Sequence, residues 1–184
     1  MSFTKTLKDK NRIIDLDGSR RGGQNRSVRR DAMAEAAAVC LEDNGHGSGT
    51  PLKVSGSNRG TFTVQWTALP IQAHAEWADL QEATEHGAYF IAIRLVDNLT
   101  GLTVVQRSKK GTGFDYWLAP KGTKTLLFQN TSRLEVSGIL RGSRAAVRQR
   151  ARQKLQQALS QIRTGAAYAA VVEFGSPLAH MVKK

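Results

Sequence analysis

A chain of 184 residues is long enough for one domain with a complete core and too short for two. Its net charge of +12 is unusually high and favours an anionic partner, either nucleic acid or a membrane surface. No apolar run reaches the length of a membrane span and the N-terminus lacks a signal-peptide core, so we expect a cytoplasmic protein with no membrane role. The single cysteine, Cys40, excludes an intramolecular disulfide and a cysteine-rich zinc site; in its Ala-rich setting we expect a buried, inert thiol.

The N-terminal part of the chain divides into three predicted segments. Residues 1–26 combine Lys and Arg with paired glycines and few large apolar side chains, so we expect a basic flexible arm, either solvated or lying along a nucleic-acid backbone. Ser27 can cap a helix that extends to about residue 44. Two short strands, 51–56 and 61–69, then form a hairpin. Residues 27–70 are therefore predicted to extend the core.

The remaining residues, 71–184, carry the pattern of a mixed α/β core. We expect a helix from about 72 to 97, with the small residues Gly87 and Ala88 at the centre of its apolar face, where another element can pack closely. The segments expected after it are strands at 102–108, 114–119 and 133–140, an apolar run at 124–130, a helix at 143–163, a strand at 167–175 and a short tail at 178–184. This α-β-β-β-α-β order predicts a mixed β-sheet flanked by helices, in which a helix connects parallel strands.

Two acidic residues lie in apolar strand patterns within a basic part of the chain. Asp115 lies in GFDYWLA and Glu135 in SRLEVSGIL, and Glu173 is the third acid between residues 98 and 184. Charged side chains are rarely buried without a partner, so each acid needs a cation. A divalent metal would satisfy Asp115 and Glu135, whereas Glu173 favours an ion pair with an arginine. The preceding helix can add Glu85, or alternatively Glu82, at the border of its buried face.

This arrangement resembles the PD-(D/E)xK nuclease superfamily, which has a restriction-endonuclease-like fold. In that family an acid comes from the first helix, an Asp from the second core strand and an acid–x–Lys motif from the third. Asp115 matches the Asp, and Glu135-Val136-Ser137 matches the third element; the resemblance covers about residues 72–177. It implies a metal-dependent endonuclease that hydrolyses DNA phosphodiester bonds with Mg²⁺ or Mn²⁺. The implied metal ligands are Asp115, Glu135, the carbonyl of Val136, and Glu85 with Glu82 as its alternative.

The chain departs from the family at Ser137, which stands where a lysine is usual and cannot supply a cation. Some family members are thought to recruit that cation from a neighbouring element. Lys154 is the best candidate because it lies beside the apolar seam of the second helix; Arg148, Arg150 and Lys121 are poorer ones. The departure could instead mean that catalysis is lost, which would leave a nuclease-fold subunit that binds nucleic acid within a larger complex. The catalytic residues implied are Glu85, Asp115, Glu135, Ser137 and Lys154.

Cationic side chains are expected to contact the nucleic-acid backbone, a sequence-independent and salt-sensitive interaction. The residues expected to do so are Lys109, Lys110, Lys121, Arg144, Arg148, Arg150 and Arg152. DNA is the expected partner and RNA the alternative; a module that packs on ribosomal RNA or accompanies a toxin would also be basic. Cutting both strands takes two active sites, which favours a homo-oligomer or a larger complex. A role in restriction or anti-phage defence is suggested by the fold alone.

Overall fold

The described residues form an eight-stranded mixed sheet with helices on both faces. The structure is a computed structural model that describes residues 12–17, 27–123, 131–160 and 165–184. The strands are β1 (Ile13–Asp15), β2 (Thr50–Gly56), β3 (Gly60–Gln65), β4 (Leu102–Arg107), β5 (Tyr116–Pro120), β6 (Ser132–Ile139), β7 (Ala167–Glu173) and β8 (Leu178–Lys183), and the helices are α2 (Val28–Asp43), α3 (Ile71–Glu76), α4 (Leu80–Leu99) and α5 (Arg144–Ser160). Across the sheet the strand order is β1-β3-β2-β8-β7-β6-β5-β4. The predicted mixed α/β class is confirmed.

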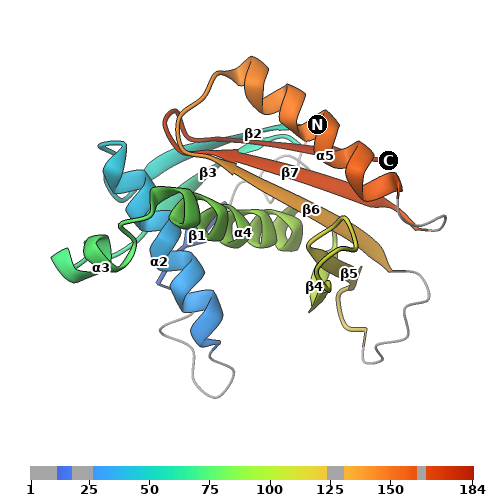
Figure 1. Cartoon of the computed structure of the whole chain (residues 1–184), viewed down its shortest axis with the longest axis horizontal. Helices are drawn as coiled ribbons and strands as arrows, with labels where there is room; N and C mark the ends of the chain where they lie inside the picture. The colour runs from blue at the N-terminus through green and yellow to red at the C-terminus, as the bar shows by residue number, and fades with distance from the viewer. Residues whose placement is uncertain (1–11, 18–26, 124–130, 161–164) are drawn as a thin grey trace, which may run out of the picture.

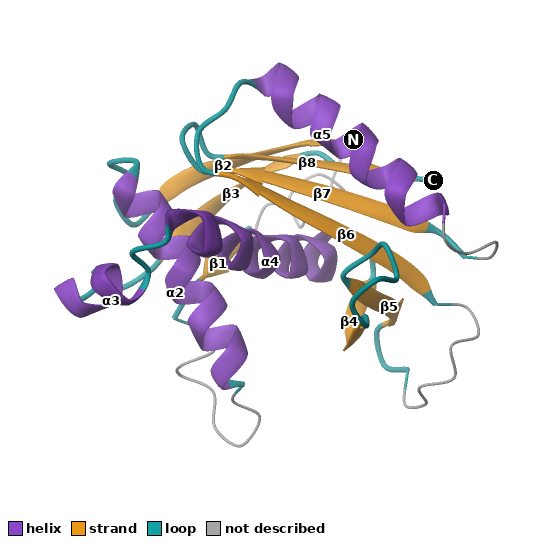
Figure 2. Ribbon diagram, viewed as in Figure 1, coloured by secondary structure: helices purple, strands orange, loops and turns teal. Residues whose placement is uncertain are grey.

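The sheet separates two helical layers (Figures 1 and 2). Helix α5 covers one face over β6, β7 and β8, whereas α4 packs on the other face and α2 packs on α4. Successive residues of β6 alternate between these layers. Leu134 and Val136 join the apolar core on the α4 side, while Glu135 and Ser137 contact side chains of α5. None of the helices in the described part of the chain is long and apolar enough to cross a membrane.

The N-terminal helix and the hairpin are confirmed. Ser27 caps α2 by accepting a hydrogen bond from the N–H of Arg30 at 3.4 Å, and β2 pairs with β3 in antiparallel register. Both elements contribute side chains to the same apolar cluster as α4 and the central strands, including Leu41 and Phe62. The N-terminal elements thus share the main core of the domain.

Strand β1 corrects the prediction of an arm over residues 1–26. Ile13–Asp15 pairs with β3 in parallel register, and Ile14 and Leu16 are buried. The carboxylate of Asp17 accepts a hydrogen bond from the N–H of Thr67 at 2.7 Å, which fixes the end of the segment. Residues 12–17 therefore belong to the sheet, and the remainder of the expected arm lies outside the described residues.

The single helix expected over residues 72–97 is divided into α3 and α4. Asp79 caps α4, because its Oδ1 accepts hydrogen bonds from the N–H groups of Gln81 at 2.9 Å and Glu82 at 3.2 Å. Trp77 ends α3 and donates its indole N–H to Glu35 at 3.1 Å, so it does not continue the apolar face of α4. The helical periodicity continues across this break, which is why the sequence pattern predicts one helix.

The C-terminal tail is a full strand, contrary to the prediction. β8 pairs antiparallel with β7 and parallel with β2, and it thereby joins the N-terminal hairpin to the central strands. Met181 is buried in the main core and Leu178 packs beneath α5. The apolar run predicted at 124–130 lies outside the described residues.

Gly87 lets α2 and α4 approach closely, as the sequence predicts for the centre of this helix face. A Cβ atom at position 87 would lie 2.8 Å from Cα and 2.9 Å from N of Ala37. Gly87→Ala should lower the free energy of unfolding by about 2 kcal/mol, because this clash outweighs the gain of about 1 kcal/mol in helix propensity. Urea unfolding measures the change. Gly47→Ala is the control, since a Cβ there meets no atom within 4 Å; equal stability of the two variants would contradict the close packing.

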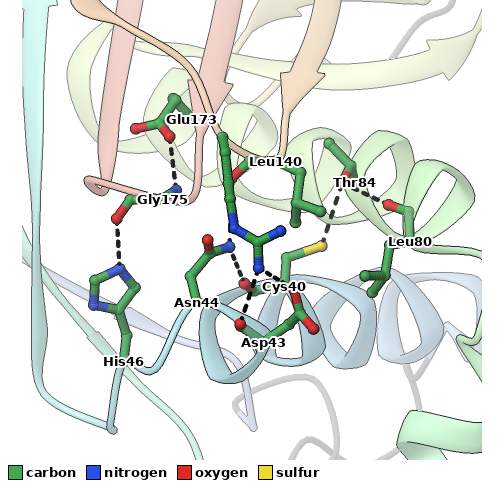
Figure 3. Close-up of polar contacts among 10 residues, drawn as sticks. Cys40, Asp43, Asn44, His46, Leu80, Thr84, Leu140, Glu173 and Gly175 are labelled. Atoms are coloured by element: carbon green, nitrogen blue, oxygen red, sulfur yellow. Dashed lines mark hydrogen bonds and ion pairs between the residues drawn. The ribbon is translucent and has the colours of Figure 1, made fainter.

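Polar contacts join α2 to the N-terminal part of α4 and to the turn after β6 (Figure 3). The thiol of Cys40 lies 3.7 Å from Oγ1 of Thr84, and Asn44 donates to the carbonyl of Leu140 at 3.4 Å. Cys40 is fully buried, which confirms the predicted burial, and this burial raises the pKa of its thiol to about 11, as an unreactive thiol requires. The contacts hold the first turns of α4 in the position where they form one wall of the candidate site.

Candidate functional site

An unpaired edge of β6 lies at the centre of the candidate site. β5 pairs with β6 only as far as Leu134, so within the described residues the rest of this edge has no strand neighbour. Asp115 directly precedes β5 rather than lying within it. It forms hydrogen bonds to this edge of β6 where a neighbouring strand would otherwise do so. Its N–H donates to the carbonyl of Leu134 at 2.9 Å, and its Oδ2 accepts from the N–H of Val136 at 2.8 Å. Since the N–H and C=O of a strand residue point to the same edge, the carbonyl of Val136 also faces this opening.

A cavity of about 620 Å³ opens beside this edge and is lined by residues of both α4 and α5. A second cavity of about 380 Å³ shares four of its lining residues and continues to the turn between β4 and β5. The shared residues are Glu85, Tyr89, Asp115 and Glu135. We refer to the two spaces together as the acid cavity.

Lys154 of α5 reaches the buried carboxylate of Glu135. Its Nζ lies 2.6 Å from Oε1 of Glu135, whose side chain is 5 % exposed. Lys154 lies between Ala151 and Ala158, both fully buried in the seam that holds α5 against the sheet. Arg150, one turn earlier on α5, donates to Oγ of Ser137 at 3.3 Å. Helix α5 therefore places one cation beside Glu135 and another beside Ser137, two residues of β6 that face this helix.

The electrostatic state of Glu135 reflects its burial and a second carboxylate. Burial first, and then the negative charge of Asp115, raise the pKa of Glu135 to about 7, while Lys154 acts in the opposite direction. Two carboxylates in one site resist simultaneous ionisation, and a cation relieves that resistance. Glu135 therefore takes up a proton at a higher pH than an ordinary glutamate does.

This raised pKa predicts a pH-dependent stability in metal-free protein. A carboxyl group whose pKa is higher in the folded state contributes stability that is complete below its unfolded pKa and is lost as the pH rises through the folded value. For Glu135 this window runs from 4.5 to about 7. Across it, the free energy of unfolding should fall more steeply in the wild-type protein than in Glu135→Gln, which has no proton to lose. Urea unfolding in EDTA over this pH range measures the difference, and parallel profiles would contradict the assignment.

Glu85 lines the acid cavity but contacts Asp115 only through Tyr89. The hydroxyl of Tyr89 lies 2.7 Å from Oε1 of Glu85 and 3.1 Å from Oδ1 of Asp115. Burial and then the charge of Asp115 raise the pKa of Tyr89, so the group keeps its proton. Glu85 and Tyr89 are four residues apart on α4, which places them on the same helix face. Glu82, the alternative to Glu85, lines neither cavity and lies beside His86 at 3.8 Å.

The predicted phosphate-binding residues divide between different surfaces. Lys109 and Lys110 line the acid cavity, as does Arg150. Arg144 and Arg148 instead line a separate cavity beside β2 and β8. The division follows from the helix period, since residues four apart share a face of α5 while neighbouring pairs do not.

The remaining two predicted contacts lie outside the acid cavity. Arg152 is exposed and donates from Nε to the carbonyl of Arg148 at 3.4 Å. Lys121 is exposed and donates to the carbonyl of Asp97 at the end of α4. Neither side chain lines a cavity described above.

Glu173 is bound by main-chain amides rather than by the arginine that the sequence predicts. Its carboxylate accepts hydrogen bonds from the N–H groups of Gly142 at 3.2 Å, Gly175 at 2.7 Å and Ser176 at 2.8 Å. Figure 3 shows the contact with Gly175. Backbone N–H groups satisfy a buried carboxylate as a cation would, and this acid orders the turns after β6 and β7.

Two residues of the acid cavity are missed by sequence reasoning. Tyr89 could have been found, because its spacing from Glu85 on a predicted helix places its hydroxyl beside that acid. Arg107 carried no such signal: it is the last residue of β4, and its guanidinium lies over the ring of Tyr89, 5.0 Å from the centroid. It lines the acid cavity together with Lys109 and Lys110.

The oxygen donors at the unpaired edge are of the type that hard divalent cations prefer. Two carboxylates, Asp115 and Glu135, and the carbonyl of Val136 are oxygen donors, and Mg²⁺ commonly uses one or two carboxylates together with water and substrate phosphate. The set of three acids expected from the sequence is not assembled, because Tyr89 separates Glu85 from Asp115; no group of three or more His, Cys, Asp and Glu in the described part of the chain could hold a metal ion. No protein-family model, curated protein or solved structure matches this chain.

Proposed function

We propose that this chain is a metal-dependent nuclease of the PD-(D/E)xK type that hydrolyses phosphodiester bonds in DNA. The observation that carries the proposal is the meeting of Asp115, Glu135 and Lys154 at the unpaired edge of β6. They come from the residue that precedes β5, from β6 and from the following helix, an order that a restriction-endonuclease-like core would explain. Lys154 supplies the cation that Ser137 does not.

The chain's own side chains have separate roles in this proposal. Asp115 and Glu135 hold the metal, with the carbonyl of Val136 as a third oxygen donor and Tyr89 orienting the Asp115 carboxylate. The ammonium of Lys154, next to Glu135, stabilises negative charge that develops on the scissile phosphate or positions the attacking water. Glu85 takes part through the hydroxyl of Tyr89 rather than as a direct ligand.

Mg²⁺ or Mn²⁺ bound to these oxygens would polarise the phosphate and lower the pKa of a coordinated water. This chemistry requires ionised carboxylates at both positions. The raised pKa of Glu135 agrees with a site that is completed by a cation, because a carboxylate pair is costly to ionise without one.

The entrance of the acid cavity suits a polyanionic substrate. Arg150 from α5, Arg107 at the end of β4, and Lys109 and Lys110 in the following turn all line the cavity. Cations in this position would neutralise backbone phosphates on both sides of the cleaved bond. With a chain net charge of +12, the binding should weaken steeply as salt is added.

A plasmid-nicking assay tests the proposal. We expect the wild-type protein to nick supercoiled DNA with Mg²⁺ or Mn²⁺ and to be inactive in EDTA, with a labelled RNA of matched length as the comparison substrate. DNA binding without cleavage under all metal conditions would contradict the nuclease and favour a binding subunit. Preferential cleavage of the RNA would retain the chemistry and overturn the choice of DNA.

A further inference from the structure

We propose that this protein has a second ligand site, a nucleotide-binding groove on the other side of α5 from the acid cavity. A cavity of about 590 Å³ lies there, between the N-terminal half of α5 and strands β2 and β8. Its size is within the range of about 300–1,000 Å³ that is typical of small-molecule sites. We refer to it as the basic groove.

Four cationic side chains line the basic groove. Lys53 comes from β2, Arg59 from the turn between β2 and β3, and Arg144 and Arg148 from adjacent turns of α5. None of the described residues that line the groove is an Asp or a Glu. Four exposed cations around one concave surface, without a carboxylate among them, favour a ligand with several negative charges.

The lining of the groove differs from that of a simple phosphate site. Pro51, Pro177 and the largely buried Leu178 give the groove an apolar lining beside the cations. An apolar lining with a cationic rim suits a ligand that combines a flat or apolar group with a phosphate, as a nucleotide does. Inorganic phosphate would leave this lining uncovered.

Ser55 and His180 add a neutral polar pair to the same groove. Oγ of Ser55 lies 2.9 Å from Nδ1 of His180, across the β2–β8 pairing. Burial, followed by the charges of Arg148 and Arg152, lowers the pKa of His180, so the imidazole is neutral near neutral pH. A neutral imidazole and a hydroxyl can hydrogen-bond to the sugar or base of a nucleotide while the cations bind its phosphate.

The basic groove is chemically independent of the acid cavity. The two sites share no lining residue, and the carboxylates proposed to hold a metal are all in the acid cavity. Nucleotide binding therefore needs neither a metal nor an active nuclease. A nucleotide unit could come from a free nucleotide or from the end of a nucleic-acid strand, and the experiment separates these sources.

Fluorescence anisotropy in EDTA tests the proposal with two probes, a labelled adenosine mononucleotide and a labelled single-stranded DNA hexamer. We expect Lys53→Gln and Arg148→Gln each to weaken binding about tenfold, since each removes a charge-assisted contact to phosphate. Arg30→Gln is the matched control, because it removes an exposed positive charge that lines neither site. All three positions are exposed, so the variants should fold like the wild-type protein.

Each outcome of this experiment decides the question. Saturable binding of the mononucleotide that is weakened by the two groove variants but not by the control supports a site for free nucleotides. If only the hexamer binds, and the two groove variants weaken its binding while the control does not, the groove is supported and its ligand is a nucleic-acid strand. Absence of binding by both probes, or equal weakening by all three variants, overturns the proposal, whatever the nicking assay shows.

Discussion

Asp115→Asn is expected to reduce metal-dependent DNA nicking by about a thousandfold while leaving the fold intact. Asparagine has the same shape, and its carbonyl oxygen can still accept the hydrogen bond from the N–H of Val136 that Asp115 accepts at 2.8 Å. The substitution removes the negative charge that would hold the metal against the phosphate, a contribution of several kcal/mol to transition-state stabilisation. Single-turnover nicking rates with Mn²⁺ measure the loss, and a thermal melt confirms the fold.

Glu82→Gln is the matched control for this charge removal. Glu82 lies on α4 near the site but contacts neither cavity, so its loss should leave the rate unchanged. A second readout separates an electrostatic role from a structural one. Because the charge of Asp115 raises the pKa of Glu135, Asp115→Asn should lower that pKa, which NMR titration of the metal-free protein can follow. Undiminished nicking by Asp115→Asn would remove Asp115 from the site.

Local patterns were sufficient for the elements that stabilise themselves over short distances. The cap at Ser27, the hairpin of β2 and β3 and the small residue Gly87 on the face of α4 can each be recognised from a few neighbouring residues, and the structure has them where the sequence predicts. Strands β1 and β8 were missed because their pairing partners are distant in sequence. A strand defined by long-range pairing leaves only a short, weak pattern in its own residues.

The residues of the candidate site were likewise predictable only where a local sequence pattern marks them. Two acids could be selected from sequence because each breaks an apolar strand pattern, and Lys154 could be selected because the family resemblance calls for a cation and this lysine lies beside the helix seam. The open edge of β6 could not, since it arises where β5 begins at Tyr116, which pairs with Leu134 and leaves the rest of that edge without a strand neighbour among the described residues. The helix period separates Arg148 from Arg150, but which cavity each residue lines could not be predicted, because it depends on how α5 is rotated against the sheet.

Lys154→Met should lower the rate of DNA nicking by about a hundredfold, the loss typical of removing one charged donor from a preorganised site. Methionine keeps most of the length and apolar character of the lysine stem, so the packing of α5 should persist. Lys154 also lowers the pKa of Glu135, and without it that pKa rises further. The residual activity should therefore need a higher pH than the wild-type activity. A pH–rate profile with Mn²⁺ measures both effects, and an unchanged rate would contradict the role of Lys154.

Moving the lysine within the acid cavity tests whether the cation itself is what Lys154 supplies. Ser137 lies two residues after Glu135, on the same face of β6, and lines the cavity. Adding Ser137→Lys to Lys154→Met places a cation at the position of the lysine in the acid–x–Lys motif of the PD-(D/E)xK superfamily. The double variant should therefore nick DNA about tenfold faster than Lys154→Met alone. Arg30→Met is the control for a lost positive charge and should nick like wild type, because Arg30 is exposed on α2 and lines neither cavity. If the double variant gains nothing although it binds DNA and Mn²⁺ normally, a cation from β6 cannot replace the one that α5 supplies.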